Sequence, residues 1–262
     1  MILNFVKKKI LKAKVQEKPF PFLFIKNLIS KKDLNNLNKA LPSYDAIIED
    51  EALYQSNSKT KASVLPKSKI YKKLNENKQF KKINFLFKKL KPLIVKKFEK
   101  EIDLYVKKKF SISSLKYHSL YAVMKKNYLK SPHIDRRDHL IHMLFYPSSD
   151  PSKGGELNIH ELKSKRNIYD VFPSKKQLKI KKKFKVNNNS CIIILNVPWA
   201  YHSVSKYKSL VDRKYLYMVY DFPISKPGSE IKNRKAGYNE NQFWKNEVKV
   251  KSLQRKKVFL TE

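Results

Sequence analysis

The sequence predicts an α+β fold that is mainly β, with a barrel or jelly roll as its core and a layer of N-terminal helices packed outside it. Two patterns lead to this prediction. Before Phe110, apolar residues recur at helical spacing among lysines; after it, short apolar or alternating segments follow one another between turn signals. Many short strands joined by turns are typical of barrels and jelly rolls, not of βαβ units. A chain of 262 residues, 41% of them hydrophobic, can fill one such core.

The first elements are a strand and a helix. Residues 19–26 predict a short apolar strand behind a proline. Ser30, with Asp33 three residues later, predicts a helix N-cap, and Pro42 predicts the end of that helix. The polar segment 43–68 is typical of a surface loop or of short ordered excursions.

Further helices are predicted on either side of these elements. Between residues 70 and 100 apolar side chains return at a period of 3.6, which predicts two helices with Pro92 at a kink or in an early turn. Residues 1–15 mix apolar residues with lysines. We expect an ordinary terminal helix or arm there; the alternative is a basic amphipathic helix on a membrane surface.

The second half of the chain predicts a series of strands. They lie at residues 115–124, 140–146, 156–160, 191–195 and 215–221. We therefore expect three regions: a strand and helical layer at 1–110, the β core at 111–223, and an extension at 224–262 that is a lid, an edge cover or a loose arm.

One short motif in this β region indicates a metal site. His133 and Asp135 are two residues apart, so on a strand their side chains leave the same face. An imidazole beside a carboxylate is two-thirds of the 2-His-1-carboxylate ligand set of non-haem Fe(II) oxygenases. His202 is the candidate third ligand, and Arg213, eleven residues later, is a cation able to hold a dicarboxylate.

Other titratable residues compete with these ligands. His139 and His142 are three apart and would leave opposite faces of a strand, so they cannot chelate one ion together. His142 shares its face with Tyr146, and we expect it to pack with a hydrogen bond. Asp138 is a further competitor, whereas His118 and His160 are expected to be structural.

The order of these motifs resembles a known family. His133-Ile-Asp135, Gly154-Gly-Glu-Leu157, His202-Ser-Val204 and Arg213 are similar to the 2-oxoglutarate/Fe(II)-dependent dioxygenase superfamily, nearest its prolyl-4-hydroxylase-like branch. The run that begins at Pro19 also looks like the lead-in of that branch, so the resemblance covers roughly residues 19–223. It implies a double-stranded β-helix (jelly roll) core.

The resemblance also implies roles for pocket residues. Arg213 would bind the distal carboxylate of 2-oxoglutarate, with Lys214 as the second choice of cation and Tyr146 as a partner. The dry walls would be Leu144, Leu157 and Val204, with Tyr121 as a weaker candidate. Two features depart from the family: the bulky Tyr215 two residues after the arginine, and an insertion at Lys130-Ser-Pro132.

The activity implied is hydroxylation of a C–H bond in an unidentified organic or peptidyl substrate, peptidyl proline or similar, with release of succinate and CO2. Fe(II), 2-oxoglutarate and O2 would be required, with ascorbate as a reductant. The alternatives are the same chemistry on a sugar, lipid, amino acid or nucleobase, and a non-catalytic basic barrel that binds polyanions.

Charge and composition indicate which partners and which cellular compartment to expect. The net charge is +37, but only six of the 59 basic residues are arginine and the lysines are spread along the chain. We therefore expect weak non-specific binding to polyanions and no dedicated nucleic-acid site. The single cysteine, Cys191, allows no internal disulfide and is expected to be buried, which fits a reducing, cytoplasmic setting. No apolar run approaches the roughly 20 residues that span a bilayer.

Overall fold

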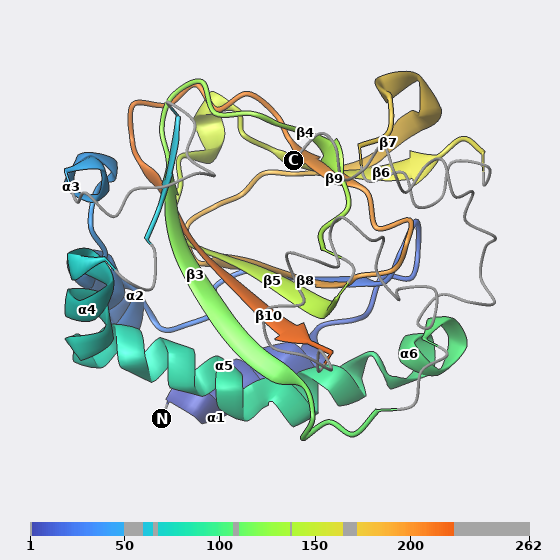
Figure 1. The fold of residues 1–262 in the computed structure, drawn as a ribbon, viewed down its shortest axis with the longest axis horizontal. Helices are drawn as coiled ribbons and strands as arrows, with labels where there is room; N and C mark the ends of the chain where they lie inside the picture. The colour runs from blue at the N-terminus through green and yellow to red at the C-terminus, as the bar shows by residue number, and fades with distance from the viewer. Residues whose placement is uncertain are drawn as a thin grey trace.

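The structure, a computed structural model, contains two facing antiparallel β-sheets with helices outside one of them (Figure 1). It describes residues 2–49, 60–64, 68–106, 110–136, 138–164 and 172–222. The larger sheet runs in the order β1 (Phe22–Ile25), β8 (Ser190–Leu195), β5 (His139–Ser148), β10 (Arg213–Asp221), β3 (Lys116–Met124) and β2 (Lys61–Ser63). The smaller sheet runs in the order β4 (Lys130–His133), β9 (His202–Val204), β6 (Leu157–Leu162) and β7 (Leu178–Phe184).

The path of the chain through these sheets identifies the fold. From β3 to β10 the chain crosses repeatedly between the two layers: β3, β5, β8 and β10 lie side by side in the larger sheet, and β4, β6, β7 and β9 form the smaller one. Eight strands in two facing layers with these crossings make a jelly roll, or double-stranded β-helix. The predicted fold is confirmed. β1 and β2 extend the larger sheet at its two edges.

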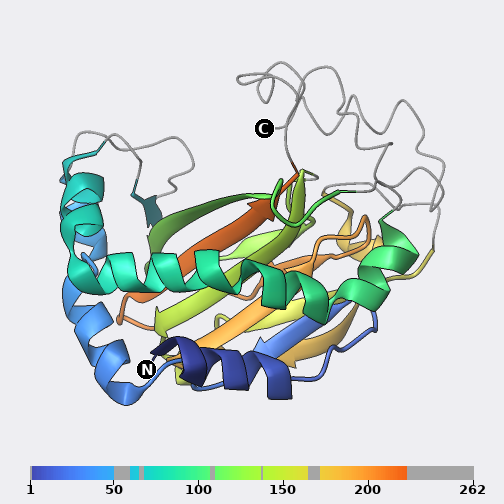
Figure 2. The same ribbon diagram turned by 90° about the horizontal axis from the view of Figure 1, so that it is seen from below.

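The helices form the predicted layer outside the larger sheet. They are α1 (Ile2–Lys12), α2 (Lys31–Ala40), α3 (Tyr44–Ile48), α4 (Lys69–Glu76), α5 (Lys78–Lys97) and α6 (Glu99–Tyr105). α1 and α5 run across the side away from the smaller sheet, whereas α3 lies at one edge, in contact with β2 (Figures 1 and 2). The long helix α5 buries one apolar stripe while its lysines face water, which is the pattern of a surface helix. α1 packs against α5 through the buried Val6 and Ile10, so its apolar side belongs to the core.

Several element boundaries differ from the prediction. The helices between 70 and 100 divide at Asn77, whose Oδ1 accepts hydrogen bonds from the Gln79 and Phe80 amides, while Pro92 lies inside α5. Of the two expectations for 43–68, short ordered excursions are found: the segment contains α3 and the edge strand β2. Ser30 caps α2 as predicted, with its Oγ accepting from the Asp33 amide.

The proposed extension at 224–262 lies outside the described residues. Cys191 lies within them and is buried on β8, as expected of a small apolar side chain. None of the helices in the described ranges is long and apolar enough to cross a bilayer.

Candidate metal centre and adjoining pocket

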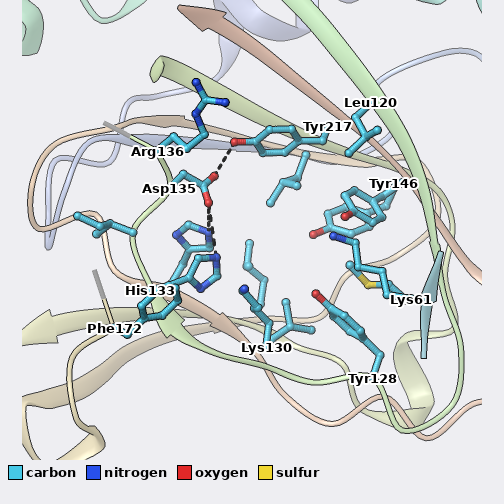
Figure 3. A pocket seen from close by; sticks show the side chains of 17 residues that line it. Lys61, Leu120, Tyr128, Lys130, His133, Asp135, Arg136, Tyr146, Phe172 and Tyr217 are labelled. Carbon is cyan, nitrogen blue, oxygen red and sulfur yellow. Dashed lines mark hydrogen bonds and ion pairs between the residues drawn. The ribbon is translucent and has the colours of Figure 1, made fainter. Parts of the chain in front are cut away.

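A cavity of about 260 Å³ lies between the two sheets, and the three candidate ligands line one end of it (Figure 3). β4 and β9 are antiparallel neighbours in which His133 faces His202 directly, and Asp135 follows two residues after His133. His133 Nε2 lies 3.5 Å from Asp135 Oδ1, and His202 Nε2 lies 3.8 Å from the same oxygen. One donor atom from each of the three residues lies within 4.8 Å of the others.

These separations suit ligands of one ion better than hydrogen-bond partners. Two ligands that are each about 2.1 Å from a metal lie roughly 3 to 3.5 Å apart, whereas a hydrogen bond between them would be shorter. The second ring nitrogens are already engaged: His133 Nδ1 is 2.8 Å from the Ser131 carbonyl oxygen, and His202 Nδ1 is 3.0 Å from that of Ala200. A ring that donates through Nδ1 to a carbonyl leaves Nε2 unprotonated and free to bind a metal.

Burial and the neighbouring side chains determine the charges of His202 and Asp135. Burial lowers the pKa of His202 to about 3, so the imidazole is neutral, as a metal ligand must be. Burial also acts to raise the pKa of Asp135, but the adjacent imidazoles hold it well below its usual value. The site therefore presents a neutral His202 imidazole and an ionised Asp135 carboxylate beside the His133 ring, and two imidazoles with one carboxylate are the residue types of the Fe(II) donor set.

Two further side chains contact Asp135. Tyr217 on β10 donates a hydrogen bond of 2.8 Å to Asp135 Oδ2, and burial raises the pKa of its hydroxyl well above the usual value, so it stays a donor. His142 Nδ1 lies 3.4 Å from the same oxygen. His142 packs beside Asp135 and His202, but neither of its ring nitrogens has a hydrogen-bond partner in the described chain, contrary to the expected hydrogen bond.

The competing residues have partners of their own. His118, His139 and Asp221 form a second cluster, in which His139 Nδ1 is 2.5 Å from Asp221 Oδ1 and His118 Nδ1 is 2.9 Å from Oδ2. These are hydrogen-bond distances, so the three groups satisfy one another without an ion. Asp138 is paired with Arg136. We therefore assign no metal to this second cluster.

The cation expected for a dicarboxylate lies at the other end of the cavity, behind its wall. Arg213 is fully buried; its Nε donates to Ser149 Oγ (2.9 Å), its Nη1 donates to the Gly155 carbonyl (2.6 Å), and its guanidinium stacks on the Tyr207 ring at 4.6 Å. Nη2 has no hydrogen-bond partner in the described chain, and no described carboxylate forms an ion pair with it. The Tyr146 ring, 5.7 Å from the guanidinium carbon, separates it from the cavity that Tyr146 lines.

The predicted walls are found, with corrections. Leu144, Leu157 and Val204 line the cavity together with Tyr146. The expectation for Tyr121 is not met: Leu120 points into the cavity, so its neighbour Tyr121 leaves the opposite face of β3, where its hydroxyl donates to the Pro42 carbonyl (2.6 Å).

Successive side chains of β10 also point to opposite faces of the sheet, which separates the residues that line the cavity from those that do not. Lys214 faces outward and donates to the Leu41 carbonyl at 2.7 Å, so it cannot replace Arg213. Tyr215 and Tyr217 point inward and line the cavity, as does Tyr128 from the turn after β3. The sequence held a usable signal for Tyr217, because it shares the face of Arg213.

No sequence signal identified Lys61, which also lines the cavity and comes from the segment predicted to be a surface loop or short ordered excursions. Its position depends on the pairing of β2 with β3, which is a long-range contact that local patterning does not reveal.

Comparison with known proteins gives remote structural similarity. No family model and no curated protein matches this sequence. A prolyl-4-hydroxylase from Pseudomonas putida has a TM-score of 0.48 at 10% identity, covering 85% of this chain and 99% of the other. A prolyl hydroxylase from Trichoplax adhaerens, in complex with a hypoxia inducible factor oxygen degradation domain peptide fragment, has a TM-score of 0.49 at 12% identity, covering 84% and 88%. Likeness this remote carries no argument about the reaction.

Proposed function

We propose that this chain is an Fe(II)- and 2-oxoglutarate-dependent dioxygenase that hydroxylates a C–H bond of an organic or peptidyl substrate. One observation carries the proposal: His133, Asp135 and His202 lie together at one end of a cavity, and a buried guanidinium lies behind Tyr146, which lines the same cavity. That guanidinium, on Arg213, has no carboxylate partner among the described residues. The first group fits a divalent metal and the second fits an organic anion.

The protein groups at the metal end would hold Fe(II) by three donors on one side, which leaves the side facing the cavity for other ligands. When bound, the iron would activate dioxygen, coupling oxidation of 2-oxoglutarate to succinate and CO2 with oxygen insertion into the substrate. The contribution of Tyr217 is to fix the orientation of the Asp135 carboxylate. The carbonyls of Ser131 and Ala200 fix the histidine rings.

The other end of the cavity fits a dicarboxylate. A buried charge without a counter-ion is costly, and Arg213 is such a charge among the described residues. A carboxylate bound beside Tyr146 would offset part of that cost, while Leu144, Leu157 and Val204 would exclude water along the carbon chain. This supports 2-oxoglutarate over a neutral co-substrate. We propose peptidyl proline or a similar group as the substrate oxidised.

The test begins with anaerobic titration of the metal-free protein with Fe(II) and 2-oxoglutarate. The wild-type protein should develop the weak visible charge-transfer band of a chelated 2-oxo acid and, in air, release succinate with a suitable substrate pool. His133→Ala should abolish the band and the succinate. His118→Ala, which removes a histidine of the second cluster, is the matched control and should retain both. Wild-type protein that binds neither Fe(II) nor 2-oxoglutarate, or an active His133→Ala variant, would overturn the proposal.

A further inference from the structure

We infer that Lys61, on the edge strand β2 outside the double-stranded β-helix, is the cation that directly contacts the distal carboxylate of the 2-oxo acid co-substrate. This inference rests on the proposed function, and it adds a residue that completes the co-substrate pocket from the N-terminal part of the chain. Arg213 would act from behind Tyr146, and Lys61 from inside the cavity.

The strand register places Lys61 at the depth of the barrel where a cation is needed. Arg213 on β10 lies directly opposite Met124 on β3, and Met124 lies directly opposite Lys61 on β2. The three residues form one row across three neighbouring strands. Because neighbouring strands are about 4.8 Å apart, the backbones of Arg213 and Lys61 are roughly 10 Å apart at the same level. Met124 lines the cavity, so its direct partner Lys61 faces it too.

From this position the side chain of Lys61 extends into the cavity. It points into the cavity beside Tyr146, with Tyr128 on the other side of the same space (Figure 3). Its Nζ lies over the Tyr215 ring, 5.8 Å from the centroid. Lys61 is only partly buried and has no carboxylate partner in the described chain. Its ammonium is therefore available to an anion that enters the cavity.

Three tyrosine hydroxyls accompany this ammonium. Tyr128, Tyr146 and Tyr215 line the cavity, and their hydroxyls make no hydrogen bonds to other described residues. Burial raises the pKa of Tyr128, while the charges of Lys61 and Arg213 act against that rise. The result is a group of neutral hydroxyl donors between two cations, which suits one carboxylate group.

Other cations do not serve this end of the cavity. Lys214 leaves the opposite face of β10 and donates to main-chain carbonyls. Lys130 lies nearer His133 in the cavity and stacks over the Phe172 ring at 5.7 Å (Figure 3). Arg136 is paired with Asp138. Lys61 is thus the described cation that reaches the tyrosine hydroxyls from the open side.

The experiment compares two ligands in the wild-type protein and in single-residue variants. The ligands are 2-oxoglutarate and 2-oxopentanoate, which has the same five carbons but no distal carboxylate. Each is titrated anaerobically against Fe(II)-loaded wild type, Lys61→Met and Lys125→Met, with the visible charge-transfer band as the readout and no primary substrate present. Lys125 follows Met124 on the chain and pairs with Asp45 at the surface (2.9 Å), so it is a control for the loss of a nearby positive charge.

Lys61→Met should weaken 2-oxoglutarate binding by about 10- to 100-fold and leave 2-oxopentanoate binding unchanged, because only the first ligand offers a carboxylate to the ammonium. Lys125→Met should change neither, and Lys61→Arg should restore most of the preference for 2-oxoglutarate. Unchanged 2-oxoglutarate affinity in Lys61→Met would overturn the role of Lys61 while the proposed function stood. Absence of the band in wild type with both ligands would instead overturn the proposed function.

Discussion

The Tyr217 hydroxyl and Asp135 Oδ2 are joined by a 2.8 Å hydrogen bond that crosses from the larger sheet to the end of β4. It links the strand that holds Arg213 to the carboxylate of the candidate metal centre. Both ends of the cavity are therefore oriented by the inner face of one strand, β10, whose alternate residues Arg213, Tyr215 and Tyr217 face inward.

Tyr217→Phe should lower metal affinity by roughly 10- to 100-fold, because a carboxylate ligand that loses its outer hydrogen bond is no longer held in one orientation. The measurement is competitive titration of Fe(II) or Mn(II) against a chelator. Tyr220→Phe is the control, since the Tyr220 hydroxyl donates to the Phe87 carbonyl (2.7 Å) and is remote from Asp135. That variant should lose about 1 kcal/mol of stability and keep its metal affinity. Equal metal affinity in Tyr217→Phe and wild type would contradict the role assigned to the hydroxyl.

Gly155→Ala should weaken 2-oxoglutarate binding as well as stability. Gly155 has φ +74°, and an added Cβ would lie 2.6 Å from Arg213 Nη2 and 2.8 Å from its guanidinium carbon, so the arginine would have to move. Gly154→Ala is a matched control, because Gly154 has φ +78° and its Cβ would meet the Lys206 carbonyl instead. Both variants should lose about 1–3 kcal/mol in denaturant unfolding, but only Gly155→Ala should bind 2-oxoglutarate more weakly. A Gly154→Ala variant with the same loss of affinity would argue against this role for Arg213.

Sequence patterns were sufficient where a purely local rule applied, as at the helix cap on Ser30. The strand β4 ends at His133, so Asp135 lies beyond it and the strand parity predicted for the two residues does not apply, although their side chains lie 3.5 Å apart. The jelly roll followed from the series of short strands. The inward direction of Tyr217 could have been predicted as well, by counting alternate residues from Arg213.

The missed features depend on contacts between distant segments. Lys61 reaches the cavity only because β2 pairs with β3, and the polar composition of 43–68 gives no sign of that pairing. The strand β7 is rich in lysine and lacks an alternating apolar pattern, and its place in the sheet is decided by pairing with β6. Tyr121 lies on a strand that borders the pocket, but it leaves the face opposite to that of Leu120 and so points away from the cavity.

His160→Gln should reduce the acid sensitivity of the metal-free protein. Burial on β6 lowers the pKa of His160 to about 4, below its ordinary value near 6.5, while one ring nitrogen contacts Ser203 Oγ at 2.7 Å. The unfolded chain therefore binds this proton first, so the stabilising contribution is complete above pH 6.5 and is lost as pH falls toward 4.

The expected size of that loss is on the order of 3 kcal/mol between pH 7 and 4. Urea unfolding of the metal-free wild type and of His160→Gln at pH 7, 6, 5 and 4 measures it. The wild type should lose more free energy of unfolding than the variant over this range. Parallel pH profiles would show that His160 does not titrate as its burial requires.

Asn189→Ala should be the most destabilising of these changes. Asn189 is buried in the left-handed region at φ 64°, its Nδ2 donates to the Ile29 carbonyl (2.7 Å), and its Oδ1 accepts from the Ile29 amide (3.0 Å). Its own amide donates to the Tyr146 carbonyl (2.8 Å). One side chain therefore ties the segment after β1 to the turn that supports the pocket tyrosine.

Alanine leaves both polar groups of Ile29 buried without partners and places a Cβ in a strained backbone conformation, for a loss of about 2–4 kcal/mol in urea unfolding. Asn189→Gly separates the two effects, because glycine adopts φ 64° without strain but also lacks the amide. It should recover about 1 kcal/mol relative to alanine and remain well below wild type, since the two hydrogen bonds are still missing. Recovery of full stability by glycine would show that strain alone, and not the bonds to Ile29, makes asparagine important at this turn.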